Sequence, residues 1–328
     1  MIKKISPLFF IQLVISGTAL FFIVRRLDGG ASLATLHALP PFIWIAASLG
    51  TAAVAHGIGV WRWQVLGNAA LQAPRPFAFY LRYYLIGLFY ATFVPGGQLM
   101  GEGVKIARMM PDASRRAALI GSIVADRLIG LAAGGALLVS LFLGSPFIRS
   151  SPVSGVGFFV GATIVAVSAA GCVWFLFSRR GAGSIMTASR SGGAGYIRSL
   201  LRTARESADL FSTKKQALAT SFLGAVAFHA AAGLLLYLTV RAYGGDANIF
   251  FVTWIYLIAS IALVLPVHYA GFGIREGVVV PLLVFAGVAG GEALLISLFF
   301  FGIQATFALT GGIWDFKDIR DLYDTLRR

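Results

Sequence analysis

The sequence predicts an all-α, polytopic membrane helix bundle. Of its 328 residues, 58% are hydrophobic and only 12% are charged, whereas a soluble domain has about 25% charged residues. The mean hydropathy is +0.83. Apolar runs recur at roughly the 20-residue length that crosses a bilayer as a helix. We therefore expect one integral membrane domain, 1–328, with about eight transmembrane helices plus a re-entrant or broken-helix segment.

Charge and cysteine content narrow the functional classes. The formal net charge of +14 sits mostly in connecting segments, which indicates membrane topology and anionic-lipid contact rather than nucleic-acid binding. Cys172 is the only cysteine, so neither an intrachain disulfide nor a thiolate metal cluster is expected. No two histidines are four residues apart, and no nucleotide-binding or metalloprotease motif occurs. We expect no metal, no cofactor and no catalytic residue.

The first half of the chain, 5–178, begins with a predicted span at 5–24. Lys3 and Lys4 precede this span, and Arg25 follows it without a small-residue cleavage site. This pattern favours a membrane span over a signal peptide. The further spans expected in this half are 40–61, 117–143 and 156–177.

A broken segment lies between the second span and the next. The apolar piece 83–94 has about 12 residues, or about 18 Å of helix, which is too short to cross comfortably. Beyond it, Glu102 and Lys105 are three residues apart and share one face of a helix. A helix down, a turn and a charged helix back would form a re-entrant hairpin, whereas the alternative is a full span from Phe77 followed by an interfacial helix. The helix-breaking residues at the turn are Pro95, Gly96 and Gly97.

The segment 179–215 gives the clearest topological signal. It holds eight Lys or Arg residues against Glu206 and Asp209, so the positive-inside rule predicts that this basic connection is cytoplasmic. Its part 196–212 could form a surface helix. The second half, 216–314, is expected to carry spans at 216–240, 249–266, 276–290 and 292–314, followed by a solvated cytoplasmic tail, 315–328.

A second break separates two of these spans. Arg275 and Glu276 follow it directly, and both ionised side chains and freed backbone groups need partners inside a bilayer. Such breaks are tolerated where they line a substrate cavity, although a short loop at the membrane surface would give the same pattern. The break residues are Pro266, Gly271 and Gly273.

The two breaks resemble each other. Pro95 precedes Glu-Gly-Val at 102–104 by seven residues, and Pro266 precedes Glu-Gly-Val at 276–278 by ten. Corresponding broken segments in two halves are typical of transporters built from inverted repeats. Coincidence in a chain with 39 glycines remains the other interpretation.

Two adjacent charges lie inside the span 117–143. Asp126 is nine residues into it, about 14 Å along the helix, where a lone charge costs about 2.5–3.5 kcal/mol. Arg127 points about 100° away on the same helix, so each charge needs a partner from another segment. We expect the charges to gather around one polar cavity, and a structural ion-pair network is the alternative. The predicted lipid-binding or translocation residues are Glu102, Lys105, Asp126, Arg127, Arg275 and Glu276.

Three motifs in order carry a resemblance to a known family. They are Phe-Val-Pro-Gly-Gly with Gly-Glu-Gly-Val-Lys at 93–105, Ala-Asp-Arg-Leu-Ile-Gly at 125–130, and Leu-Pro followed by Gly-Phe-Gly-Ile-Arg-Glu-Gly at 265–277. They resemble signatures of the transmembrane region of lysylphosphatidylglycerol synthetase/flippase proteins and their stand-alone relatives. The resemblance covers about 5–315. Gln98 and Met100 depart from a more Gly-rich turn.

The resemblance implies a lipid-handling bundle in a bacterial inner membrane. The eight predicted crossings and the cytoplasmic basic connection place both termini in the cytoplasm. The chain ends at Arg328, so the soluble aminoacyl-transferase domain and its lysine transfer are expected to be absent. The implied partner is an anionic phospholipid or lipid-linked substrate, with a second copy of the chain or a lipid-biosynthesis enzyme as a protein partner. Three functions remain open: a flippase-like transporter, a non-transporting scaffold for an isoprenoid, hopanoid or glycolipid pathway, and a membrane-embedded lipid transferase.

The topology can be tested by cysteine labelling on a Cys172→Ala background. A cysteine replacing Arg190 should react with a membrane-impermeant maleimide only after the cells are opened, because the basic connection is cytoplasmic. Labelling of this position from outside intact cells would contradict the topology.

Overall fold

The fold is built from α-helices. A computed structural model describes residues 17, 18, 21, 40–71, 74–94, 97–109, 116–152, 154–177, 211, 213–263 and 271–326, and no strand occurs within these ranges. The predicted all-α polytopic bundle is confirmed. The predicted span 5–24, most of the basic connection 179–215 with its surface helix, and the break residues Pro95, Gly96 and Pro266 lie outside the described residues.

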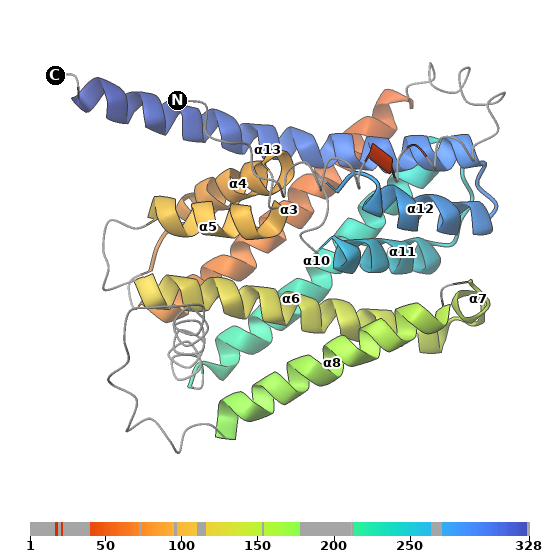
Figure 1. Ribbon diagram of the computed structural model, residues 1–328, viewed down its shortest axis with the longest axis horizontal. Helices are drawn as coiled ribbons and strands as arrows, with labels where there is room; N and C mark the ends of the chain where they lie inside the picture. The colour runs from red at the N-terminus through yellow and green to blue at the C-terminus, as the bar shows by residue number, and fades with distance from the viewer. Residues whose placement is uncertain are drawn as a thin grey trace.

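Four described helices are long and apolar enough to cross a membrane. A fifth, α8, has 24 residues, or about 36 Å of helix. These long helices run alternately up and down the bundle, as Figure 1 shows. Their bounds are Phe42–Leu71 for α3, Arg116–Gly144 for α6, Ser154–Phe177 for α8, Lys215–Ala242 for α10 and Gly290–Leu326 for α13, with the one-turn α7, Pro146–Arg149, between α6 and α8.

The centre of the bundle is an antiparallel pair, α3 and α10, which form the most extensive contact between two elements. The Trp61 ring covers Gly224, and the Arg62 guanidinium lies 5.7 Å from the centroid of the Phe228 ring. Glycine lets the two helices approach here because a side chain at this position would meet the indole. Near its end α3 is stabilised by Asn68, whose side-chain oxygen accepts a hydrogen bond from the Arg75 backbone N–H at 2.8 Å.

The broken segment before α6 is a helical hairpin. α4, Phe77–Phe93, and α5, Gly97–Met109, pack against each other, and they lie side by side in Figure 1. A Cβ on Gly101 would overlap the Gly87 carbonyl oxygen and lie 2.8 Å from the Ala91 Cβ. The predicted down-and-back path is therefore present, but its first helix starts at Phe77, where the alternative interpretation placed it. With 17 and 13 residues, the helices are about 25 and 20 Å long. We call α4 and α5 the first hairpin.

The second break also separates two short helices, which corrects the prediction of two full spans at 249–266 and 276–290. α11, Ile249–Ala262, has 14 residues and α12, Ile274–Phe285, has 12. At about 21 and 18 Å they are too short to cross a 30 Å hydrocarbon core. They pack against each other, and α11 is buried because it is apolar on nearly every side, as at Trp254 and Leu257. We call α11 and α12 the second hairpin.

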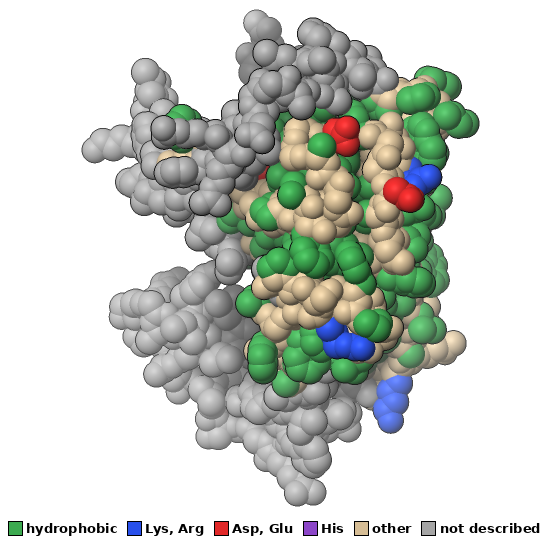
Figure 2. Space-filling model, turned by 90° about the vertical axis from the view of Figure 1, so that its right-hand side faces the viewer, with side chains coloured by type: hydrophobic (Ala, Val, Ile, Leu, Met, Phe, Trp, Pro, Cys, Tyr) green, Lys and Arg blue, Asp and Glu red, His purple; other side chains and the backbone are tan. Residues whose placement is uncertain are grey.

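The two hairpins enter the bundle from opposite ends (Figure 1). The first starts where α3 ends and α6 begins, and the second starts where α10 ends and α13 begins. We call the first of these ends the basic end because it carries Arg75, Arg82, Arg108, Lys214 and Lys215. Among the described residues, the other end carries two basic and two acidic side chains, Arg149, Arg241, Asp246 and Glu292. The face in Figure 2 shows a few separated charges on hydrophobic and uncharged surface.

α13 continues without a break through 315–326, whereas the sequence predicted that the span ends at 314 and a solvated tail follows. It crosses the first hairpin at two adjacent glycines. A Cβ on Gly311 would overlap the backbone of Leu85, and one on Gly312 would lie 2.6 Å from the Phe89 ring. The close approach of α13 to α4 therefore depends on glycine, which has no side chain, at both positions.

Gly311→Ala should lower the stability of the folded protein. The added methyl group would collide with the Leu85 backbone, and overpacking of this kind costs about 1–3 kcal/mol. Gly302→Ala on the same helix is the control because no atom lies within 4 Å of its Cβ position. Thermal unfolding in detergent should give a lower apparent Tm for Gly311→Ala alone. Equal Tm values for the two variants would contradict the close contact.

Candidate functional site

The first candidate site is centred on Glu102 of α5. Its carboxylate forms ion pairs with Lys105, one turn later on α5, and with Arg127 of α6. The spacing of three places Glu102 and Lys105 on one face of α5. The Lys105 stem packs over Gly87, where a Cβ would lie 2.6 Å from its Cγ. The Lys105 ammonium lies 4.8 Å from the centroid of the Trp63 ring, in cation–π contact.

Asp126 of α6 binds Arg62 of α3 in a bidentate ion pair. The Arg62 Nε donates to Oδ1 at 2.7 Å and Nη2 donates to Oδ2 at 2.9 Å. Both side chains are nearly buried, and the remaining nitrogen, Arg62 Nη1, has no hydrogen-bond partner among the described residues. The fork geometry of arginine suits such a paired contact with a carboxylate. We call Arg62, Glu102, Lys105, Asp126 and Arg127 the first ionic cluster.

Exposure differs strongly within the first ionic cluster. The Lys105 and Glu102 side chains are 8% and 14% exposed, whereas the Arg127 side chain is 45% exposed. Val124 and Leu128, which flank Arg127 on α6, are themselves exposed. Three cations face two carboxylates in this cluster, so it carries one excess positive charge. The cation of the cluster with the most exposed side chain is Arg127.

A chain of polar side chains leads from this cluster to α13. The Tyr84 ring lies 5.9 Å from the Lys105 ammonium. The Tyr84 hydroxyl is 3.2 Å from His56 Nδ1, and His56 Nε2 is 2.8 Å from the Gln304 Oε1. These distances fit a neutral histidine that accepts from Tyr84 and donates to Gln304. Three helices, α3, α4 and α13, are joined by this chain.

Arg275 and Glu276 form a second ionic cluster with Ser297 of α13. The Arg275 Nε donates to Glu276 Oε1 at 3.0 Å, and Ser297 Oγ lies 3.3 Å from the same oxygen. Glu276 Oε2 accepts the backbone N–H of Gly273 at 2.8 Å, so the carboxylate also caps the start of α12. Gly273 has φ of 82°, a conformation that favours glycine. The Arg275 and Glu276 side chains are 5% and 0% exposed.

One face of α13 contacts the second ionic cluster, His56 of α3 and the first hairpin. Ser297 and Phe301 touch Arg275, and Gln304 holds His56. Gly311 packs against the backbone of α4. Asp315 accepts hydrogen bonds from Tyr90 at 2.7 Å and from Arg108 at 3.1 Å. The steps of four, three, seven and four residues keep these positions on one side of the helix.

The structure brings together four of the six predicted site residues. Glu102 and Lys105 join Arg127 directly, and Asp126 adds its pair with Arg62. Arg275 and Glu276 bind each other instead. Within the described ranges, hydrogen bonds and ion pairs hold the six residues in three groups rather than around one cavity: Glu102 with Lys105 and Arg127, Asp126 with Arg62, and Arg275 with Glu276. Of the predicted break residues, Gly97, Gly271 and Gly273 are described, with φ of 53°, 80° and 82°.

Sequence reasoning missed several members of these networks. Arg62 lies just beyond the predicted span 40–61, yet α3 continues to Leu71 and keeps Arg62 inside the bundle. Asp315 was assigned to the solvated tail but is 2% exposed. The sequence does carry a signal for both residues, because apolar residues continue at helical spacing beyond Arg62 and beyond Asp315. The other missed residues are His56, Tyr84, Tyr90 and Gln304.

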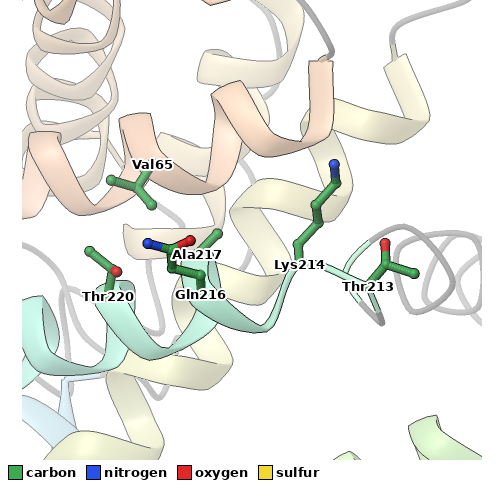
Figure 3. A pocket seen from close by; sticks show the side chains of 6 residues that line it. All are labelled: Val65, Thr213, Lys214, Gln216, Ala217 and Thr220. Carbon is green, nitrogen blue, oxygen red and sulfur yellow. The ribbon is translucent and has the colours of Figure 1, made fainter.

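A pocket of about 380 Å³ lies apart from both clusters, between α3 and the start of α10. Figure 3 shows Val65 above Gln216, Ala217 and Thr220, with Lys214 where α10 begins. No cluster side chain lines it. The described residues also contain no group of three or more His, Cys, Asp or Glu side chains that could hold a metal ion.

Neutralising one partner of the Arg62–Asp126 pair should be strongly destabilising. Asp126→Asn leaves the Arg62 charge unpaired in the interior, and breaking a buried pair costs about 3–5 kcal/mol. The double variant Arg62→Gln/Asp126→Asn removes both charges and should recover most of the loss. Thermal unfolding of the wild type, both single variants and the double variant measures this coupling. Strictly additive losses would show that the two side chains do not depend on each other.

Comparison with known proteins identifies the family. The family model described as the lysylphosphatidylglycerol synthase TM region matches residues 9–312. A comparison with curated proteins gave no significant match. The matched range contains both hairpins, both ionic clusters, three of the four helices that are long and apolar enough to cross a membrane, and most of the fourth, Gly290–Phe316. The chain therefore belongs to the lysylphosphatidylglycerol synthase transmembrane-region family.

Proposed function

We propose that the protein binds a phospholipid or lipid-linked substrate by its anionic headgroup at the first ionic cluster and moves it between leaflets. The observation that carries this proposal is the position of Arg127. It lies nine residues after Ala118, where the apolar part of α6 begins, or about 14 Å into the span. An exposed guanidinium at this depth, between exposed apolar residues, is costly unless it has a role.

The arrangement around Arg127 allows a lipid phosphate to replace its partner. Glu102 is held by both Lys105 and Arg127. If Arg127 turns to a phosphate, Lys105 still neutralises the carboxylate, so no buried charge is stranded. Arginine binds phosphate through two parallel charge-assisted hydrogen bonds. The excess positive charge of the cluster favours an anionic headgroup over a cationic one.

We further propose that the membrane is a bacterial inner membrane and that both termini face the cytoplasm. Counting the expected span 5–24 with the five long helices gives six crossings, which place the two termini on the same side. The basic end would be cytoplasmic, because basic residues are retained on that side. The first hairpin would then enter from the cytoplasm and meet the inner leaflet.

Arg127→Gln should remove lipid binding and transport while leaving the protein folded. Loss of a hydrogen bond to a charged group is worth about 1.5–3 kcal/mol, or roughly a 10- to 150-fold loss of affinity. Native mass spectrometry should find less phosphatidylglycerol bound, and a fluorescent-lipid translocation assay in proteoliposomes should fall toward protein-free vesicles.

Arg241→Gln is the matched control. Arg241 is 37% exposed and forms an ion pair with Asp246 at the opposite end of the bundle, so it removes a comparable charge away from the cluster. It should transport like the wild type. Full transport by a stable Arg127→Gln protein would end the proposal. Absence of transport by the purified wild type would favour a scaffold role instead.

A further inference from the structure

We propose that His56 is a proton-binding site that couples headgroup binding at the first ionic cluster to the uptake of one proton. The inference rests on the proposed function, because the proton enters together with the anionic headgroup and leaves with it. It gives a role to a buried histidine that headgroup binding itself does not use, and it makes a proton gradient the energy source for lipid movement.

His56 lies near the middle of the bundle. It follows Phe42, the first of the 30 residues of α3, by 14 positions, or about 21 Å of helix, and it is 6% exposed. Arg62 of the first ionic cluster comes six residues later on α3, about 9 Å further along. Histidine is the side chain whose unperturbed charge changes near neutral pH. A proton held at this depth therefore lies within reach of the charges of the cluster.

Both ring nitrogens of His56 are hydrogen-bonded, and each bond reaches a different helix. The Tyr84 hydroxyl of α4 is 3.2 Å from Nδ1, and the Gln304 Oε1 of α13 is 2.8 Å from Nε2. The amide oxygen of Gln304 accepts hydrogen bonds and does not donate. Nε2 therefore carries a hydrogen whether the ring is neutral or protonated, and Nδ1 is the atom that gains the proton.

Tyr84 provides the route to this nitrogen. Its side chain is half-buried, and its ring lies 5.9 Å from the Lys105 ammonium. A hydroxyl both donates and accepts. The Tyr84 O–H bond breaks as the Nδ1–H bond of His56 forms, and the Tyr84 oxygen takes a proton from a hydronium ion at the exposed side of the cluster. Tyr84 is unchanged at the end of the step, and the sum is one proton added to His56.

The charges around His56 decide when it takes the proton. Its hydrogen-bond partners among the described residues are uncharged, and the sum of the nearby charges is the one excess positive charge of the first ionic cluster. This charge opposes a second cation, so His56 is neutral while no headgroup is bound. The titratable, charged and uncharged groups that face this region are Arg62 of α3, Tyr84 of α4, Glu102 and Lys105 of α5, Asp126 and Arg127 of α6, His229 of α10, Tyr256 of α11, and Gln304 and Phe307 of α13.

Headgroup binding removes this opposition. A phosphodiester at Arg127 brings one negative charge, which cancels the excess positive charge of the cluster. Protonation of His56 then costs less, and a site that holds both lipid and proton has the same total charge as the empty site. By linkage the effect is reciprocal, so a proton on His56 strengthens headgroup binding by the same factor.

The proton also changes a contact of the first hairpin. In the neutral state Tyr84 donates to Nδ1 of His56, whereas in the protonated state Nδ1–H donates and the Tyr84 hydroxyl must turn its hydrogen elsewhere. The bond from Nε2 to Gln304 stays as it is. Protonation therefore acts on α4 of the first hairpin, the element that also packs against the Lys105 stem through Gly87. A local change of charge biases the position of the hairpin in this way.

The pH dependence of lipid binding tests the coupling. The Kd of the purified wild type for short-chain phosphatidylglycerol, measured by calorimetry in detergent between about pH 5 and 8, should rise with pH. The reason is that binding takes up a proton, which is scarcer at higher pH. The rise is at most about tenfold per pH unit, the value for one full proton. The lipid phosphate keeps its charge over this range.

His56→Gln should remove the pH dependence, because glutamine does not titrate. Its Kd should change less than about twofold over the same range. His229→Gln is the matched control. His229 also lies 14 positions into its helix, α10, and is 9% exposed, but it bonds the Gly130 backbone oxygen at 3.0 Å rather than Tyr84. This control should keep the pH dependence of the wild type.

The wild type alone gives a second measurement, which does not depend on a variant that folds. Titrations in buffers of different ionisation enthalpy count the protons taken up for each lipid bound. A count of zero, a wild-type Kd that is constant with pH, or an equal pH dependence in folded His56→Gln would overturn the inference and leave the proposed function standing. If the wild type binds no phosphatidylglycerol at any pH, the proposed function fails and this inference fails with it.

Discussion

The need to pair every charge in an apolar interior organises this bundle. Arg62 with Asp126 ties α3 to α6, Glu102 ties α5 to α6, and Arg108 with Asp315 ties α5 to α13. Lipid-like surroundings supply little hydrophobic attraction between helices, so such pairs and close glycine contacts must position them. These three pairs each join different elements, and in the second ionic cluster Ser297 makes the connection to α13.

Glycines complete this scheme by allowing charged or polar groups to reach one another. Gly87 makes room for the Lys105 stem, and Gly130 leaves space beside Arg62, whose Nη1 would lie 3.4 Å from a Cβ there. Gly311 brings α13 onto the backbone of α4. A larger side chain at these positions would separate the helices and lengthen the ion pairs, so packing and electrostatics depend on the same small residues.

The class of fold and the position of both breaks could be predicted from the sequence. Composition and the helix-breaking Pro and Gly residues are local signals that do not depend on how the helices pack. It also indicated that Arg127 needs a partner from another segment, and the structure shows that this partner is Glu102. It could not show that α11 and α12 are short, since the apolar pattern of 249–266 runs past the end of α11 at Ala262. Nor could it pair Asp126 with Arg62, 64 residues earlier, because that choice depends on which long helices become neighbours.

The face of α13 that carries Ser297 and Asp315 has a mechanical consequence. Ser297 and Asp315 are 18 residues apart, about 27 Å along one straight helix, and they contact different hairpins. A rigid rod that shifts or rotates at one end must also move at the other. Weakening the contacts between α13 and one hairpin therefore changes the free energy of the contacts between α13 and the other hairpin. By thermodynamic linkage this influence is reciprocal, so each hairpin affects the other through α13.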